Sequence, residues 1–253
     1  MRAIILIKWT LVSLLSLMSC FAQASVPQRI VSLSLCTDQL LLMLAPRQHI
    51  VSLTRGAVDP DLIVGSAFAS RDAVHFLRQL GYPVKLIGLP VSIAEIRDLL
   101  LAFGEWVGSP ERAEQVVRKM DWQLANLNPQ QDRVKKTALI YSSNGYTIGS
   151  GTLENVMLNA AGFHNLAVDM GVVGFEQITL ERVVAAQPAF LFIENHIDNS
   201  DSLASQYVNH PVLDKMLLSK QREFIPSRLR ACAGPMVVEA INYLSENHHD
   251  SKP

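Results

Sequence analysis

Apolar residues along this chain follow two alternating patterns, short continuous runs and longer stretches with helical spacing. The short runs predict buried strands at residues 29–34, 49–53, 61–65, 84–88, 137–141, 189–194 and 223–225. The helical stretches predict helices at residues 38–45, 70–80, 92–104, 153–161, 180–186 and 234–246. Their predicted N-caps include Thr37, Ser70, Ser92 and Thr179, and residues 142–151 form a polar loop. Strands that alternate with helices indicate an α/β fold with parallel sheets and right-handed crossovers.

The longest helical pattern covers residues 109–128. Ser109 is suited to cap it, Pro110 suits the first helical position, and Asn128-Pro129 ends it. Such a helix would be about 28 Å long. Similar strand–helix alternations lie on both sides, so we interpret it as a bridging helix between an N-terminal lobe (25–108) and a C-terminal lobe (129–253), each Rossmann-like. An ordinary amphipathic helix inside one domain is the alternative.

The first lobe is predicted to be shortened. Only residues 54–60 connect its second predicted strand to its third. A crossover between parallel strands needs about ten to twelve residues or more. The comparable strand of the second lobe, residues 189–194, follows a full predicted helix. The first lobe therefore lacks a helix that its counterpart has.

The N-terminus resembles a secretory leader. Arg2 and Lys8 precede an apolar run at residues 9–18, and Ala22-Gln23-Ala24 is a cleavage pattern. We predict a signal peptide at residues 1–24 and an exported, periplasmic protein, with lipid attachment at Cys20 as the alternative. With 49% hydrophobic residues and 18% charged residues, the chain can bury a sizeable core. A net charge of −1 excludes a basic surface for nucleic acid.

Cleavage would leave Cys36 and Cys232 as the internal cysteines. In an exported protein such a pair indicates a disulfide. Two cysteines so far apart in sequence could equally remain separate thiols. Both alternatives stay open at this stage.

Several segments together resemble the periplasmic substrate-binding proteins of ABC importers for metal chelates, the family that binds cobalamin, ferric siderophores and haem. The similar segments are RIVSLS at 29–34, PDLI at 60–63, GSPERA at 108–113, AAGFHN at 160–165, and LERV at 180–183 followed by Pro188. The resemblance runs from about residue 29 to residue 244. Each motif is degenerate, but their order and spacing together are specific.

The resemblance implies two lobes with a ligand cleft between them and a rigid helix behind. It implies an iron- or cobalt-containing chelate as ligand, no resident cofactor or metal site, an inner-membrane permease as partner, and a monomer. It also implies a permease-docking carboxylate on each lobe, and Glu181 takes that role in the second. The first-lobe counterpart would lie on the missing helix, so no residue inherits the role.

Ligands of open parallel sheets bind beyond the carboxyl ends of the strands. This rule selects Cys36, Thr37 and Phe68 in the first lobe, and Tyr146, Thr147, Ser150, Asn195, His196, Arg228 and Arg230 in the second. Glycines and hydroxyls before a helix offer N–H donors, and Tyr146 adds an aromatic face. The arginines suit carboxylates. His196 is either a metal ligand or a surface side chain.

Other function classes have weaker support. A binder of free divalent metal ions would show three or four His, Asp or Glu side chains at the cleft, and only His196 is suitably placed. A truncated copy that does not transport is consistent with the shortened lobe. A periplasmic enzyme is the least supported class, because the sequence holds neither a GxSxG nor an HExxH motif.

Overall fold

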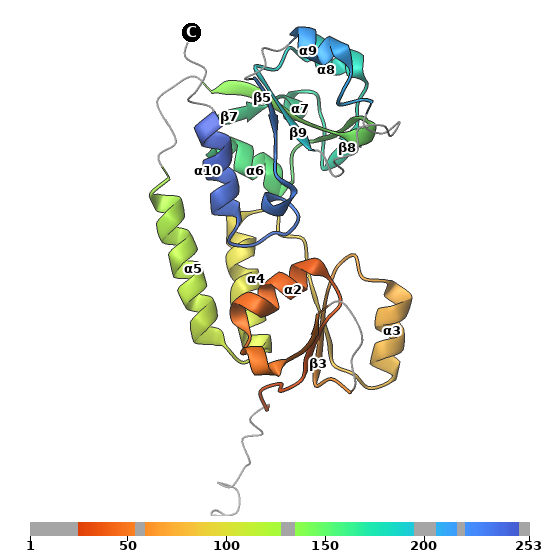
Figure 1. The fold of residues 1–253 in the computed structure, drawn as a ribbon, viewed down its shortest axis with the longest axis vertical. Helices are drawn as coiled ribbons and strands as arrows, with labels where there is room; N and C mark the ends of the chain where they lie inside the picture. The colour runs from red at the N-terminus through yellow and green to blue at the C-terminus, as the bar shows by residue number, and fades with distance from the viewer. Residues whose placement is uncertain (1–24, 54–58, 128–134, 195–205, 217–220, 248–253) are drawn as a thin grey trace, which may run out of the picture.

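The computed structural model describes residues 25–53, 59–127, 135–194, 206–216 and 221–247. Within these ranges the chain forms two β-sheets, one in each of two lobes, with helices α4 (Ile93–Trp106) and α5 (Pro110–Ala125) running between them (Figure 1). The predicted signal peptide, Cys20, Asn195 and His196 lie outside the described residues. In the described part, no helix combines the length and the apolar character needed to cross a bilayer.

The described first lobe contains a four-stranded parallel sheet in the order β2-β1-β3-β4. Its strands are β1 (Ile30–Ser32), β2 (Ile50–Leu53), β3 (Leu62–Ser66) and β4 (Val84–Ile87), with a 3-10 turn η1 (Arg47–His49) before β2. Figure 1 shows α2 (Leu35–Leu44) and α3 (Arg71–Gln79) on opposite sides of this sheet. Side chains therefore alternate between two cores: Ile30 faces α2, and Val31 faces α3.

Strands β2 and β3 follow each other among the described strands but are not neighbours in the sheet. Strand β1 lies between them. Among the described residues, no helix lies between β2 and β3. Val51 and Leu53 on the edge strand are 47% and 38% exposed. Within the part of the chain that the structure describes, no crossover helix therefore covers these two apolar side chains of β2.

In the described second lobe, the sheet has six strands in the order β10-β9-β5-β6-β8, and β7 pairs with β5. The strands are β5 (Lys136–Ser142), β6 (Tyr146–Ile148), β7 (Phe163–Asn165), β8 (Phe175–Gln177), β9 (Phe190–Glu194) and β10 (Arg222–Phe224). The helices are α6 (Leu153–Ala160), α7 (Leu166–Asp169), α8 (Leu180–Ala186), α9 (Pro211–Met216) and α10 (Val237–Asn247).

The predicted parallel arrangement holds for most of this sheet but not for β6. Strand β6 runs antiparallel to both β5 and β8, although β5, β7, β9 and β10 are parallel. The segment predicted as a polar loop at residues 142–151 contains β6. A strand of three residues is too short for an alternating pattern to identify it.

The helix boundaries also differ from the prediction at several caps. Helix α2 begins at Leu35 because Ser34, not Thr37, caps it by accepting a hydrogen bond from the Thr37 backbone N–H. Ser70 and Ser92 cap their helices as predicted. Ser109 and Thr179 make no side-chain capping hydrogen bond. Helix α10 begins at Val237 rather than at residue 234.

The bridging helix α5 spans Pro110–Ala125 rather than residues 109–128, and Asn126 follows it as C-cap. An ion pair between Glu114 and Arg118, one helical turn apart, lies on its exposed face at 3.0 Å. Helix α5 packs along α4 and also contacts α10 of the second lobe (Figure 1). An ion pair between Arg97 of α4 and Asp121 of α5, 2.7 Å apart, adds to the α4–α5 contact.

Both lobes share a continuous hydrophobic core. Its buried members include Ile30 in β1, Phe103 in α4, Met120 in α5, Ile140 in β5 and Leu244 in α10. The lobes are therefore joined by a packed layer of helices, of which the bridging helix is one member. Such a layer resists large relative movement because close-packed interiors deform little.

Candidate ligand-binding cleft

A cavity of about 600 Å³ lies between the two lobes. The first lobe contributes Phe68, which follows β3, and residues 89–91, which follow β4. The second lobe contributes residues 142–144 and 151–154, together with Arg230, Ala231, Ala233 and side chains from β6 and β8. Much of this lining follows the carboxyl ends of β3, β4 and β5, where parallel sheets bind their ligands.

Exposed aromatic rings line the cavity on both sides. Phe68 of the first lobe is 79% exposed, and Tyr146 and Phe175 of the second lobe are 46% and 61% exposed. Tyr146 begins β6, and Phe175 pairs in register with Ile148 at the other end of that strand. Large apolar rings left open to water in a concave site offer flat faces for an apolar or conjugated ligand.

A buried ion pair forms part of the cavity wall. Arg230 and Glu154 have side chains that are 6% and 14% exposed, and Arg230 Nη2 lies 3.4 Å from Glu154 Oε1. Glu154 is fixed by its place in the first turn of α6, which Thr152 caps. A guanidinium group carries five N–H donors, so Arg230 can hold this carboxylate and also bind an anionic group of a ligand.

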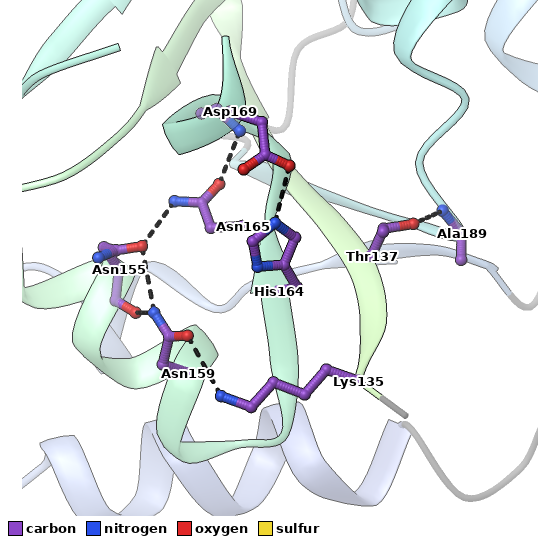
Figure 2. Close-up of polar contacts among 9 residues, drawn as sticks. Lys135, Thr137, Asn155, Asn159, His164, Asn165, Asp169 and Ala189 are labelled. Atoms are coloured by element: carbon purple, nitrogen blue, oxygen red, sulfur yellow. Dashed lines mark hydrogen bonds and ion pairs between the residues drawn. The ribbon is translucent and has the colours of Figure 1, made fainter. Parts of the chain in front are cut away.

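Asn165 holds the second-lobe wall together from behind (Figure 2). Its side-chain amide donates to the Ile148 backbone oxygen at 2.9 Å and to Asn155 Oδ1 at 3.0 Å. Its carbonyl oxygen accepts from the Ala167 N–H at 3.1 Å. Ile148 lines the cavity, and Asn155 follows Glu154 in α6. One buried amide therefore ties β6, α6 and α7 together behind the site.

An exposed pair lies next to this amide. His164 Nε2 is 2.7 Å from Asp169 Oδ2, and both side chains are about half exposed, at 44% and 55% (Figure 2). At the far edge of the same view, the Ala189 N–H donates to Thr137 Oγ1 at 3.0 Å and links the start of β9 to β5. These contacts stabilise the lobe and lie outside the cavity lining.

The structure brings Phe68, Tyr146 and Arg230 of the predicted residues together in the cavity. Three predicted hydroxyls bond within the protein instead. Thr37 is buried against Ser32 Oγ at 2.6 Å, Thr147 donates to the Ile140 backbone oxygen at 2.7 Å, and Ser150 donates to that of Val172 at 3.3 Å. Arg228 is exposed and pairs with Glu239 at 2.8 Å. None of these four lines the cavity.

Sequence reasoning missed Glu154, Phe175 and residues 89–91, which line the cavity. The strand-end rule would have selected residues 89–91 if it had been applied to β4 as it was to β3. Glu154 lies in the first turn of a predicted helix, where a carboxylate is also favoured by the helix dipole alone. Phe175 lies in a strand that the sequence pattern did not reveal.

The structure joins Cys36 to Cys232 by a disulfide with a Cα–Cα distance of 5.2 Å. Cys36 lies in the first turn of α2 in the first lobe. Cys232 lies in the second lobe between the 3-10 turn η4 (Ser227–Leu229) and α10, flanked by Ala231 and Ala233 of the cavity lining. A covalent bond thus connects the lobes beside the cavity.

Two ionisable groups lie together elsewhere in the second lobe. Glu181 is exposed in the first turn of α8, and hydrogen bonds from its own backbone N–H and from Thr179 lower its pKa, with a smaller effect from His210. This carboxylate is therefore charged at neutral pH. Burial raises the pKa of Tyr141 to about 12, with further contributions from Tyr207 and Glu181.

A second hollow of about 640 Å³ lies between α5 and α10. Its lining is mainly apolar and includes Met43, Met120, Met236 and Trp122. It is formed by helical faces and the segment before α10, and no strand end opens into it. The interlobe cavity is therefore the better candidate for the principal binding site.

Two α/β lobes, a helical layer between them and a cavity at the ends of the strands define a two-lobed ligand-binding protein. The described residues contain no group of three or more His, Cys, Asp or Glu side chains that could hold a metal ion.

The sequence was compared with models of known protein families. The family model for periplasmic binding proteins matches residues 56–223. The chain belongs to this family.

Comparison with curated proteins gives relatives of similar description. The chain is 25% identical over 155 residues to a cobalamin-binding protein of Halobacterium salinarum, covering 60% of this chain and 42% of the relative. It is 28% identical over 141 residues to a vitamin B12-binding protein of Salmonella choleraesuis, covering 54% and 52%. The chain thus spans about half the length of the curated relatives it matches.

Solved structures share the fold over most of their length. A periplasmic heme-binding protein from Roseiflexus sp. RS-1 has a TM-score of 0.69 at 19% identity, with 88% of this chain and 98% of that chain covered. The periplasmic vitamin B12 binding protein of Vibrio cholerae has a TM-score of 0.68 at 17% identity, with 88% and 96% covered. At these identities the likeness establishes the fold alone.

Proposed function

We propose that this protein is the substrate-binding component of an ABC importer. It captures a metal chelate of the ferric siderophore, cobalamin or haem type in the interlobe cavity and delivers it to an inner-membrane permease. The observation that carries this proposal is the cavity of about 600 Å³ between the lobes, lined by exposed aromatic rings and by Arg230. Family membership and the ligands named for the similar proteins support it.

The lining of the cavity suits such a ligand. A chelate brings its own metal coordination, so the protein needs surfaces that recognise the organic part. Phe68, Tyr146 and Phe175 supply flat faces for a macrocycle or an aromatic chelating group. Arg230 supplies a positive charge for a carboxylate or phosphate group of the ligand.

The shared core and the disulfide both oppose wide opening of the lobes. We therefore expect the cavity to be largely formed before the ligand arrives and to close by only a small movement. Small-angle scattering of the free and the liganded protein would test this expectation. A large fall in the radius of gyration on binding would contradict it.

The proposal includes export and docking. Residues 1–24 act as the signal peptide, so mass spectrometry of the protein recovered from the periplasm should give a mature chain beginning at Ser25. Lipid attached at Cys20 would contradict that cleavage site.

Glu181, exposed and charged on α8, docks with cationic groups of the permease.

The docking role can be separated from binding. A Glu181→Lys variant should lower chelate uptake by cells while the purified protein keeps its affinity, because the charge reverses outside the cavity. Glu105→Lys, a matched reversal at an exposed position of α4, should leave uptake unchanged. Equal uptake by the wild type and Glu181→Lys would exclude Glu181 as a docking residue.

Parallel calorimetric titrations with a ferric siderophore, cobalamin and haem test the binding function. We expect saturable binding of one of them. Phe68→Ala and Tyr146→Ala should each weaken it about tenfold, since a lost aromatic contact costs about 1.4 kcal/mol. Phe76→Ala is the matched control, because Phe76 is 59% exposed on α3 and does not line the cavity. Absence of saturable binding to any of the three chelates would overturn the proposal.

A further inference from the structure

The cavity residue Arg230 and the disulfide residue Cys232 belong to one short segment. This segment, residues 230–234, begins directly after η4, lies in the connection between η4 and α10, and has no regular secondary structure. Ala231 and Ala233 line the cavity together with Arg230, whereas Cys232 between them is bonded to the other lobe. The segment therefore faces the ligand site and is covalently held from the opposite lobe.

The two ends of the segment are held by the backbone. The Leu229 N–H donates to the Pro226 oxygen, and the Val237 N–H donates to the Gly234 oxygen, each at 3.0 Å. At its centre, the disulfide holds Cys232, and Cys36 Sγ lies 3.2 Å from the Ala231 backbone oxygen. The centre of the segment thus depends on Cys36 for its position.

Cys36 is a rigid anchor. It lies in the first turn of α2, whose Ser34 cap and fully buried Thr37 are hydrogen-bonded to each other, 2.9 Å apart. Leu40 and Leu41 of the same helix are buried in the core that the lobes share. The disulfide transmits this fixed position to the segment that carries Arg230.

We infer that the Cys36–Cys232 disulfide positions Arg230 for the anionic group of the ligand, so that chelate affinity depends on the redox state of this bond. The inference rests on the proposed function. Glu154 is held independently by the capped first turn of α6. Only the arginine side of the pair therefore moves when the disulfide opens.

The redox step is a thiol–disulfide exchange with a dithiol reductant. A thiolate of the dithiol attacks one sulfur, forms a mixed disulfide and releases the other cysteine as a thiolate. The second thiol of the reductant then displaces the first cysteine. Two electrons and two protons pass to Cys36 and Cys232, and the dithiol becomes a disulfide. Both cysteines are partly exposed, which gives the reductant access to the bond.

The test combines removal of the disulfide with removal of the positive charge. The proteins are the wild type, Cys36→Ser/Cys232→Ser, Arg230→Gln and the triple variant, titrated with the three chelates named above. With the disulfide intact, Arg230→Gln should weaken binding about tenfold, the effect of losing one charged hydrogen bond. In the serine background, the same change should weaken binding less than about twofold, since Arg230 is no longer in place.

A matched control separates positioning from general loosening. Phe68→Ala lies on the other lobe and should weaken binding about tenfold in both backgrounds. Wild-type protein treated with dithiothreitol should lose affinity about tenfold and regain it on reoxidation. This reversible measurement also decides the question if the serine variants fail to fold, which circular dichroism would report.

The outcomes distinguish the two proposals. If no chelate binds the oxidised wild type, the proposed function fails and the inference fails with it. If a chelate binds with the same affinity before and after reduction, the inference alone is overturned. It is also overturned if Arg230→Gln weakens binding equally in both backgrounds, because Arg230 would then not depend on the disulfide.

Discussion

At the scale of single residues, Asn165 has the clearest structural role. It is 1% exposed, and its side chain meets β6, α6 and α7 through hydrogen bonds of 2.9 to 3.1 Å. An asparagine can serve all three because it carries donors and an acceptor on one short side chain. Asn165 ends the AAGFHN segment at residues 160–165. Its role in that segment is to form the hydrogen bonds that buried polar groups behind the cavity wall require.

Asn165→Ala should destabilise the protein by about 2–3 kcal/mol, because it leaves the Ile148 oxygen and the Ala167 N–H buried without their partner. Urea unfolding monitored by circular dichroism would measure this. Asn159→Ala is the control. Asn159 is an exposed asparagine near the end of α6, so its replacement should change stability by no more than about 0.5 kcal/mol. Equal effects of the two variants would contradict the assigned role.

Tyr141 illustrates the opposite case, a buried hydroxyl that finds no hydrogen-bond partner among the described residues. Tyr141→Phe should therefore raise stability at pH 7 by about 1 kcal/mol. The pKa of Tyr141, raised to about 12, adds a pH dependence. The unfolded chain loses this proton near pH 10, where the folded protein keeps it, so wild-type stability falls as pH rises between about 10 and 12.

Tyr141→Phe has no ionisable hydroxyl at this position, so it lacks this part of the loss of stability at alkaline pH. The stability difference between variant and wild type should therefore grow from pH 7 to pH 11 in urea titrations. A variant less stable than the wild type at pH 7 would show that the hydroxyl makes a favourable contact after all.

Part of the candidate site was predictable residue by residue, and part was not. The strand-end rule located the cavity residues Phe68, Tyr146 and Arg230. The rule gives the position of a residue along the chain but not the direction in which its side chain points. Thr147 follows Tyr146 in β6, so its side chain points to the opposite side of the strand, where it donates to the Ile140 oxygen. Hydroxyls such as Thr37 also satisfy local groups first, so their type alone does not identify ligand contacts.

At the scale of elements, the α4–α5 pair depends on one glycine. A Cβ atom on Gly104 would lie 2.4 Å from the Cβ of Ala113. The lack of a side chain at Gly104 thus lets the two helices approach closely. The cost of a glycine in a helix, about 1 kcal/mol relative to alanine, is offset by this packing.

Gly104→Ala should destabilise the protein by about 1–2 kcal/mol, since overpacking outweighs the gain in helix propensity. The double variant Gly104→Ala/Ala113→Gly moves the small residue to the partner helix. It should be more stable than the sum of the two single changes predicts, by at least about 1 kcal/mol. Additive effects in thermal unfolding would show that these positions do not oppose each other.

Element prediction succeeded where the pattern was long or buried. The strands β1, β3, β5 and β9 were found because both of their faces are covered, which makes them continuous apolar runs. Strands β6 and β8 were missed because each has three residues and carries an exposed aromatic residue, Tyr146 or Phe175. Their antiparallel pairing follows from contacts distant in sequence, which local periodicity does not record.

At the scale of the whole molecule, the repeated strand–helix pattern was enough to predict two lobes. The packing of α10 against α5 and α6 was not predictable, because it joins segments that are remote in sequence. The prediction of a lone bridging helix therefore missed the core that the lobes share. This core, rather than the length of one helix, determines how the lobes are held.

Calorimetry should accordingly give a single unfolding transition, with equal calorimetric and van't Hoff enthalpies. The same should hold for Cys36→Ser/Cys232→Ser at a lower melting temperature, because the common core and not the cross-link makes the lobes cooperate. Two separated transitions in either protein would show that the lobes unfold independently.

The shared core also fixes an order of events during synthesis. Ile30 is synthesised more than two hundred residues before Leu244, although both side chains belong to the same core. The growing chain cannot bury its early apolar residues completely until α10 has left the ribosome. Early folding intermediates should therefore expose part of this core, and its burial is completed only when α10 docks against α5 and α6.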